Sequence, residues 1–309
     1  MADITAAAVK DLREKTGVGM MDCKRALTET GGDMEAAIDW LRTKGLSKAA
    51  KKAGRTAAEG LIGIAAKDGA AVAVEINAET DFGARNDEFK DFGKKAAEIA
   101  LTVDGDAEKL LAAPYAGAET VQLTLTNLIA KIGENMTLRR VQALSVNPGV
   151  VATYVHSAVT PETGKIGVLV ALKSEGDKDK LTHFGRQIAM HIAAVAPLAV
   201  SVEGLPADVV AHERSVQQEI VAQKSAGKPA NIVEKMLEGA MRKFYEENVL
   251  LSQVFVIDGK ATVAEAVKNA AKDIGAEVEI TGFVRYKVGE GIEKAVDDFS
   301  AEVSKLAGH

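Results

Sequence analysis

The sequence predicts an α+β protein built from several small parts. Apolar residues at helical spacing, with capping residues at the ends, indicate three short helices at the N-terminus. A pair of strands followed by a helix occurs twice in the middle of the chain. We therefore expect a small three-helix N-terminal module, a core of two subdomains that each pack an antiparallel sheet against helices, a protruding antiparallel helical hairpin and a C-terminal helix.

The N-terminal module and a basic linker fill residues 1–55. Thr5 is placed to cap the first helix, Gly17 to end it, and Asp33 to cap the third. Helices this short bury little surface, so we expect a small module on a tether. The linker contains no acid and carries Lys44, Lys48, Lys51, Lys52 and Arg55. It either attracts RNA or forms a solvated hinge, and its lack of aromatic residues favours the hinge.

The core is expected in two pieces, residues 56–147 and residues 148–200 together with 250–290. Alternating or continuous apolar runs bounded by turn residues mark its strands. These strands are expected at about 61–66, 71–76, 136–146, 150–157, 165–172, 255–257 and 278–286. Helices are expected from Asn86 onward and at about 120–132, 179–195 and 262–274. Asn86 can cap the first of them, and Thr262 to Glu265 form a capping box at the start of the last.

Residues 201–249 are expected to form a helical hairpin inserted into the second subdomain. Its two helices, at about 207–225 and 230–248, are separated by Gly227-Lys228-Pro229, which is a strong helix breaker. The first helix has few apolar residues, so the hairpin should protrude rather than be buried. A last helix is expected in residues 291–309, with an apolar stripe that covers either its own core or a partner.

Composition narrows the class of protein. The 309 residues are 47% hydrophobic and 27% charged, a composition typical of a soluble globular protein. The net charge of -6 argues against a protein whose whole surface tracks nucleic acid. Cys23 is the only cysteine, which excludes internal disulfides and fits a reducing compartment. No basic segment leads into an apolar run at the N-terminus, and no apolar run is long enough to span a membrane. We expect a cytoplasmic protein.

The stretch from Glu75 to Asn86 joins a predicted strand to a predicted helix and carries an unusual pair, Asp81 and Phe82. Connecting segments run over the surface, where an aromatic side chain gains nothing unless it packs on its own fold or on a partner. From these residues alone, packing of Phe82 on the following helix is favoured over contact with a partner.

Residues 75–86 closely resemble a signature of the bacterial elongation factor Ts family, the guanine nucleotide exchange factors of elongation factor Tu. The sequence Glu-Ile-Asn-Ala-Glu-Thr-Asp-Phe-Gly-Ala-Arg-Asn departs from the family pattern at Gly83, where the family usually has Val. A second signature covers Thr16 to Leu27, with Leu12-Arg13 before it. The likeness extends over nearly the whole chain and includes residues 131–135, 187–194, 282–286 and 288–291.

The resemblance implies a set of residues that contact elongation factor Tu. They are Thr80, Asp81, Phe82, Arg13, Met20, Met21, Lys24, Ile132, Gly133, His156, Val256 and Ile257. For several of these residues a purely structural role is the alternative. Adjacent Met20 and Met21 cannot both face the core of a small module, so one of them is expected to be exposed, either to solvent or to a partner. Val256 and Ile257 fit an ordinary strand, and Gly133 fits the end of a helix, whereas His156 is favoured as a partner contact.

The sequence lacks the motifs of an enzyme. It has no P-loop, no complete dinucleotide-binding glycine motif, no zinc-protease helix and no nucleophile elbow, and its five histidines have no metal-ligand spacing. We expect no catalytic residue, no metal, no cofactor and no direct nucleotide binding.

Two functions of different classes follow. The first, implied by the resemblance, is an exchange factor that promotes GDP release from elongation factor Tu by inserting Asp81 and Phe82 near its magnesium and phosphate site. The alternative is a ribosome- or RNA-associated adaptor that uses the basic linker. Substitution of Phe82 tests the first, and neutralisation of Lys48, Lys51 and Lys52 tests the second.

Overall fold

The computed structural model describes residues 4–44, 47, 49, 52–67, 69–117, 119–225 and 228–293. The chain divides into two compact units. Unit 1 comprises Met1–Gly63, Val74–Val141 and Lys287–His309, and unit 2 comprises Ile64–Ala73 and Gln142–Tyr286. Of the helix expected at residues 291–309, residues 294–309 lie outside the described part of the chain.

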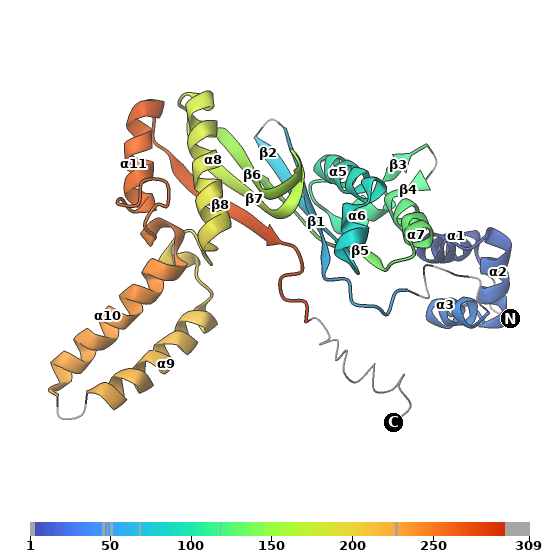
Figure 1. Ribbon diagram of the computed structural model, residues 1–309, viewed down its shortest axis with the longest axis horizontal. Coiled ribbons are helices and arrows are strands. Elements are labelled where there is room, and N and C mark those ends of the chain that lie inside the picture. The colour runs from blue at the N-terminus through green and yellow to red at the C-terminus, as the bar shows by residue number, and fades with distance from the viewer. Residues whose placement is uncertain are drawn as a thin grey trace. The chain divides into compact units, whose positions relative to one another are not determined.

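Within the described residues, the main sheet has six strands in the order β5-β2-β1-β7-β6, with β8 also paired to β7. These strands are labelled in Figure 1. Its strands are β1 (Glu59–Lys67), β2 (Ala70–Ala78), β5 (Met136–Ser145), β6 (Gly149–Thr160), β7 (Thr163–Lys173) and β8 (Glu279–Lys287). The prediction of a separate sheet in each subdomain was therefore wrong, because both strand pairs join one sheet. Alternation along a strand indicates which residues face inward but not which strand it pairs with.

The helices that were predicted for unit 1 begin close to the expected residues. In its described residues, unit 1 has the helices α1 (Ala6–Thr16), α2 (Met20–Glu29), α3 (Met34–Thr43), α4 (Asp81–Arg85), α5 (Asp87–Thr102), α6 (Ala107–Ala112) and α7 (Val121–Ile132), with a small ladder of β3 (Pro114–Ala116) and β4 (Glu119–Thr120). The predicted caps are confirmed: Thr5 and Asp33 accept backbone N–H groups at the starts of α1 and α3, and Asn86 does so for α5. The sequence did not predict α4, α6 or the β3–β4 ladder.

The N-terminal module packs on α7 rather than hanging from a tether. Its own core is made by apolar residues of all three helices, including Leu12, Leu27 and Leu41. The Thr126 hydroxyl of α7 donates a hydrogen bond of 2.7 Å to the backbone carbonyl of Glu14. Figure 1 shows α1 beside α7. Thr126 is one of several polar residues of α7, and the sequence offered no sign that its hydroxyl would join the module to the core.

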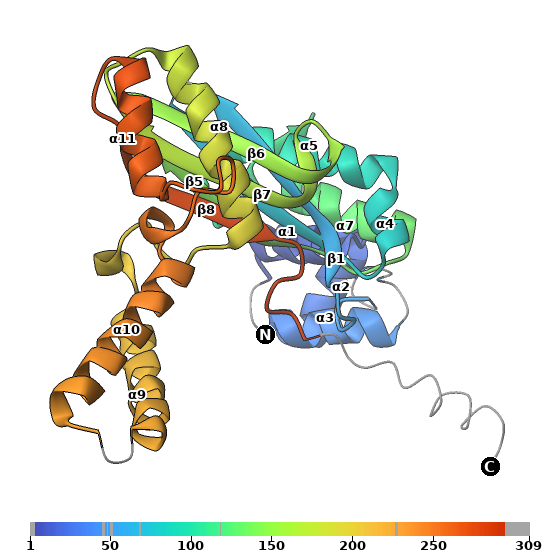
Figure 2. The ribbon, with the colours of Figure 1, turned by 60° about the vertical axis from the view of Figure 1, so that its left-hand side comes forward.

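Unit 2 packs helices on β6 and β7. Its helices are α8 (Lys178–Val195), α9 (Ala207–Lys224), α10 (Ala230–Asn248) and α11 (Val263–Ile274), with one-turn helices η1 (Val202–Gly204) and η2 (Leu250–Ser252). Helix α8 lies over β6 and β7 (Figure 2) and buries Phe184, Ile188 and Ile192 against Val168 and Val170. The capping box predicted for α11 is present between Thr262 and Glu265.

Two expectations for unit 2 had different outcomes. Helices α9 and α10 are present where two helices were expected, and each has a single buried residue, Val221 in α9 and Met241 in α10. The strand expected at residues 255–257 is wrong, since Val256 and Ile257 lie in a turn. Three apolar residues in a row are too short a signal to separate a strand from an exposed turn.

Candidate partner-binding site

Helix α4 turns one aromatic ring into solvent. Its single turn buries Gly83 and Ala84, while Phe82 is 78% exposed. The packing of Phe82 on the following helix, which the residues alone favoured, does not occur. A Phe side chain left in water forgoes roughly 1.5–3 kcal/mol of burial. The exposed ring is therefore a costly feature for the free protein and one that a partner can bury.

Thr80 and Glu134 hold the start of α4. The Thr80 hydroxyl accepts the Gly83 N–H at 3.1 Å, as an N-cap does. One carboxylate oxygen of Glu134 accepts the Thr80 N–H at 3.1 Å, and the other accepts the Thr80 hydroxyl at 2.6 Å. Because Glu134 lies in the turn after α7, these bonds tie that turn to the residue that precedes Asp81.

Ile132 and Gly133 end α7 directly before Glu134. Gly133 has φ 85° and ψ 15°, and its N–H donates to the Ile129 carbonyl at 2.9 Å. A Cβ at this position would meet no atom within 4 Å, so the left-handed backbone and not crowding requires the glycine. The structure thus brings together five of the predicted contacts: Thr80, Asp81, Phe82, Ile132 and Gly133.

Asp81 is paired within its own helix. Its carboxylate lies 3.0 Å from the Arg85 guanidinium, four residues along, and both side chains are largely open to solvent. An exposed pair of this spacing contributes only about 0.3–0.5 kcal/mol. The Asp81 carboxylate can therefore leave Arg85 for another partner at little cost.

The N-terminal module carries four further predicted contacts, all of them exposed. These are Arg13, Met20, Met21 and Lys24. Both methionines reach solvent, Met20 at 43% and Met21 at 78%, although only one was expected to do so. The reason is that α2 begins at Met20 and buries a stripe that starts only at Cys23.

The remaining predicted contacts lie in unit 2. His156 is exposed on β6, and its Nδ1 lies 3.1 Å from the Tyr154 hydroxyl. Val256 and Ile257 are each 45% exposed. The turn that carries Val256 and Ile257 is hydrogen-bonded to a buried histidine of α8, which the sequence did not single out.

That histidine, His191, has no exposed surface. The Val256 N–H donates to its Nδ1 at 3.3 Å, so its Nε2 carries the proton and donates to the side-chain amide oxygen of Gln253 at 2.9 Å. Burial lowers the pKa of His191, and the hydrogen bond to Gln253 only partly opposes this. The signal that could have found it is its place on the buried stripe of α8, between Ile188 and Ile192.

Comparison with known proteins decides the family. The sequence model of the family described as elongation factor TS matches residues 79–290. Elongation factor Ts of Rhodospirillum centenum is 57% identical over 309 residues, which is 100% of both chains. That of Parvibaculum lavamentivorans is 58% identical over 308 residues, or 99% of both, and that of Rhizobium etli is 58% identical over 305 residues, or 98% of both. The chain belongs to the elongation factor Ts family.

Membership of the elongation factor Ts family makes the protein a nucleotide exchange factor of translation elongation and not an enzyme. Within the described residues, no group of three or more His, Cys, Asp or Glu side chains is arranged to hold a metal ion. Among the described helices, none combines the length and the apolar character that a membrane span requires.

The elongation factor Ts signature also contains a structural residue, Glu75, which has no exposed surface. Arg139 and Arg140 of β5 both bond to its carboxylate, and the Gly289 N–H donates to it at 2.8 Å. The strand around it was predicted to be half-buried, yet β2 is buried on both faces from Ala71 to Ala78. Glu75 therefore fastens the segment after β8 to the sheet, and its role in the signature is one of architecture.

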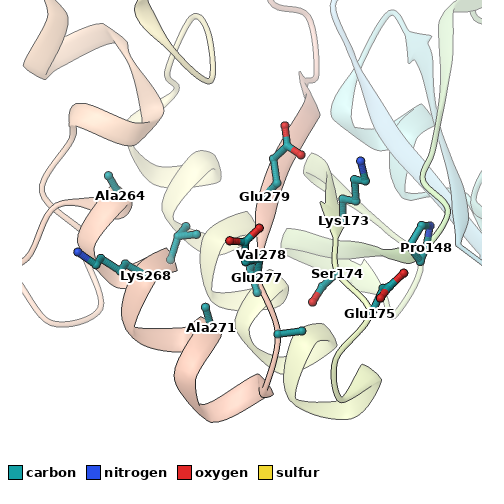
Figure 3. A pocket seen from close by; sticks show the side chains of 12 residues that line it. Pro148, Lys173, Ser174, Glu175, Ala264, Lys268, Ala271, Glu277, Val278 and Glu279 are labelled. Carbon is teal, nitrogen blue, oxygen red and sulfur yellow. The ribbon is translucent and has the colours of Figure 1, made fainter.

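The structure also contains a cavity of about 830 Å³ in unit 2 (Figure 3). Ala264, Lys268 and Ala271 of α11 line one side of it, and Lys173 and Glu279 from the ends of β7 and β8 line another. None of the predicted contact residues belongs to its lining. The cavity and the candidate interface are therefore separate features.

The basic linker is partly described. The Lys44 ammonium lies 5.7 Å from the centre of the Trp40 ring. The Arg55 guanidinium lies 3.3 Å from the Glu79 carboxylate, and the Arg55 carbonyl accepts a 2.7 Å hydrogen bond from Asn135. Lys48 and Lys51 lie outside the described residues. The two described ends of the linker thus have contacts within the protein.

Proposed function

We propose that this protein promotes GDP release from elongation factor Tu by inserting the side chains of Asp81 and Phe82 near the magnesium and phosphate site of that partner. The observation that carries the proposal is the 78% exposure of Phe82 on a helix whose start is held by three hydrogen bonds. Because the start of the helix is held in place, Phe82 loses less conformational entropy when it enters a partner.

Exchange of this kind works by linkage. A protein that binds the nucleotide-free partner more tightly than the nucleotide-bound one must weaken nucleotide binding by the same factor. Nanomolar nucleotide binding corresponds to about 12 kcal/mol, so rapid release requires the loss of several kcal/mol of contacts at the phosphates and the ion. A protein can cause such a loss with one well-placed ring and one carboxylate.

The two side chains have different tasks. Phe82 supplies apolar surface that fills a slot in the partner and holds its elements apart. Asp81 supplies a carboxylate that competes for the groups which hold magnesium and its water ligands. Because the Asp81–Arg85 pair is exposed, opening it takes little from the free energy of binding.

The test is the rate of release of a fluorescent GDP from elongation factor Tu, measured by stopped flow at several concentrations of this protein. We expect the wild-type protein to accelerate release, and Phe82→Ala and Asp81→Ala each to reduce the acceleration by about tenfold or more. Val159→Ala is the matched control, because Val159 is an exposed apolar residue outside the predicted contacts. Full acceleration by Phe82→Ala would exclude the proposed wedge.

A further inference from the structure

Glu134 occupies the space in which a side chain at position 83 would lie. A Cβ built on Gly83 would come within 2.7 Å of the Glu134 carboxyl carbon and nearer still to one of its oxygens. Atoms that are not bonded do not approach so closely, so either position 83 is glycine or the carboxylate moves away. The two residues are therefore coupled.

The same Glu134 carboxylate also holds Thr80 through two hydrogen bonds, which we call the clasp. It accepts two hydrogen bonds from Thr80, and the Thr80 hydroxyl in turn accepts the Gly83 N–H. These three bonds form a continuous chain from the turn after α7 into the first turn of α4. Bonds to an ionised carboxylate are stronger than those between neutral groups, and a linked chain adds cooperativity.

Helix α4 depends on such support more than most helices do. It has five residues, and a helix of one turn does not persist on its own in water. The direction of the helix axis determines where Phe82 points, because the backbone at the capping residue sets the position of the residues in the first turn.

We propose that Glu134 is a positioning residue that fixes the direction of Phe82, and that Gly83 serves to admit its carboxylate. This inference rests on the proposed exchange function. A larger side chain at position 83, such as that of Val, would displace the carboxylate from the place it occupies here.

The first measurement is the rate of amide hydrogen exchange at Thr80 and Gly83 in the free protein, monitored by NMR. Glu134→Ala should lower the protection of the Thr80 amide by about tenfold, because its acceptor is lost. Glu134→Gln should lower it less, since an amide retains only one acceptor oxygen for the two donors. Glu98→Ala, at an exposed residue of α5 paired with Lys95, is the control and should change nothing at α4. Unchanged protection in Glu134→Ala would overturn the clasp.

The second measurement is stimulated GDP release, with the maximal rate separated from the concentration that gives half of it. Glu134→Ala should lower the maximal rate of GDP release about tenfold, because a misdirected Phe82 ring still docks but does not complete the distortion of the partner. The urea midpoint of unfolding should stay within error. A normal maximal rate together with lost Thr80 protection would overturn the positioning role. Failure of the wild-type protein to accelerate release would instead overturn the proposed function, and the positioning role with it.

Gly83→Ala separates the clasp from helix propensity. Alanine favours a helix over glycine, so propensity alone predicts a firmer α4 and full activity. The clasp predicts the opposite: the new methyl group displaces Glu134, and the variant loses protection and rate as Glu134→Ala does. The double variant Gly83→Ala/Glu134→Ala should then be no worse than either single one. Additive losses, or an active Gly83→Ala, would contradict the coupling.

Discussion

At the scale of single residues, the Glu75 carboxylate is tightly held by its neighbours. It is fully buried and receives hydrogen bonds from Asn77, Arg139, Arg140 and the Gly289 backbone. Burial by itself raises the pKa of Glu75, but the bonds from Gly289, Asn77 and Arg140 together outweigh it and hold that pKa below its usual range. Glu75 is therefore ionised in the folded protein over a wide range of pH.

The replacement Glu75→Gln should lower the free energy of unfolding at neutral pH by about 2–3 kcal/mol, because it removes the buried negative charge to which Arg139 and Arg140 bond. The lowered pKa means that this stability is present above the ordinary pKa of 4.5 and is lost as the pH falls below it. Urea denaturation from pH 7 to pH 3 tests both points, with the exposed Glu98→Gln as control. The wild-type protein should lose more stability over that range than Glu75→Gln, and parallel curves would contradict the role given to Glu75.

At the scale of elements, the sequence predicted best where pattern and caps agreed. Helices α1, α3, α5 and α11 begin at the residues their caps indicated, because a side chain that satisfies free N–H groups acts locally. Prediction failed where the deciding contact was distant. The start of the helix that carries the exposed Phe82 is bonded to Glu134, 52 positions beyond Phe82, and the turn at Val256 is hydrogen-bonded to His191 of another helix.

The helical hairpin α9–α10 should be the least protected pair of long helices in unit 2. Each helix has one buried residue, and its firm attachment is a small cluster of Ala199, Leu205 and Val249 at its base. Helix α8, by contrast, buries eight residues. Local opening is easiest where few apolar contacts are lost, so amides near the tip should exchange fastest and those near the base more slowly.

Hydrogen exchange followed by mass spectrometry would measure this gradient, with peptides of α8 as the internal reference. Residues 214–224 and 230–240 should exchange at least about tenfold faster than α8. Equal protection of tip, base and α8 would mean that the hairpin is stabilised by contacts other than those at its base.

At the scale of the whole molecule, the predicted contacts are distributed over both units. Thr80, Asp81, Phe82, the module residues and the end of α7 belong to unit 1, whereas His156, Val256 and Ile257 belong to unit 2. The sequence located most helices and strands and the exposed candidates, but not the single sheet, since strand pairing depends on edges that meet only after folding. A partner that contacts both units can use one for affinity and the other for distortion.

This division of tasks leads to a kinetic prediction. Phe82→Ala in unit 1 should lower the maximal rate of GDP release from elongation factor Tu, because it removes an interaction that acts at the distortion step. Ile257→Ser in unit 2 should instead raise the half-saturating concentration about tenfold and leave the maximal rate nearly unchanged, because an apolar contact made equally before and after release contributes only to binding. Stopped-flow release over a wide range of protein concentration separates the two parameters, with Val159→Ala as the control for an exposed apolar residue. If both substitutions changed the same parameter, the two units would share one task, and the distinction drawn between affinity and distortion would be wrong.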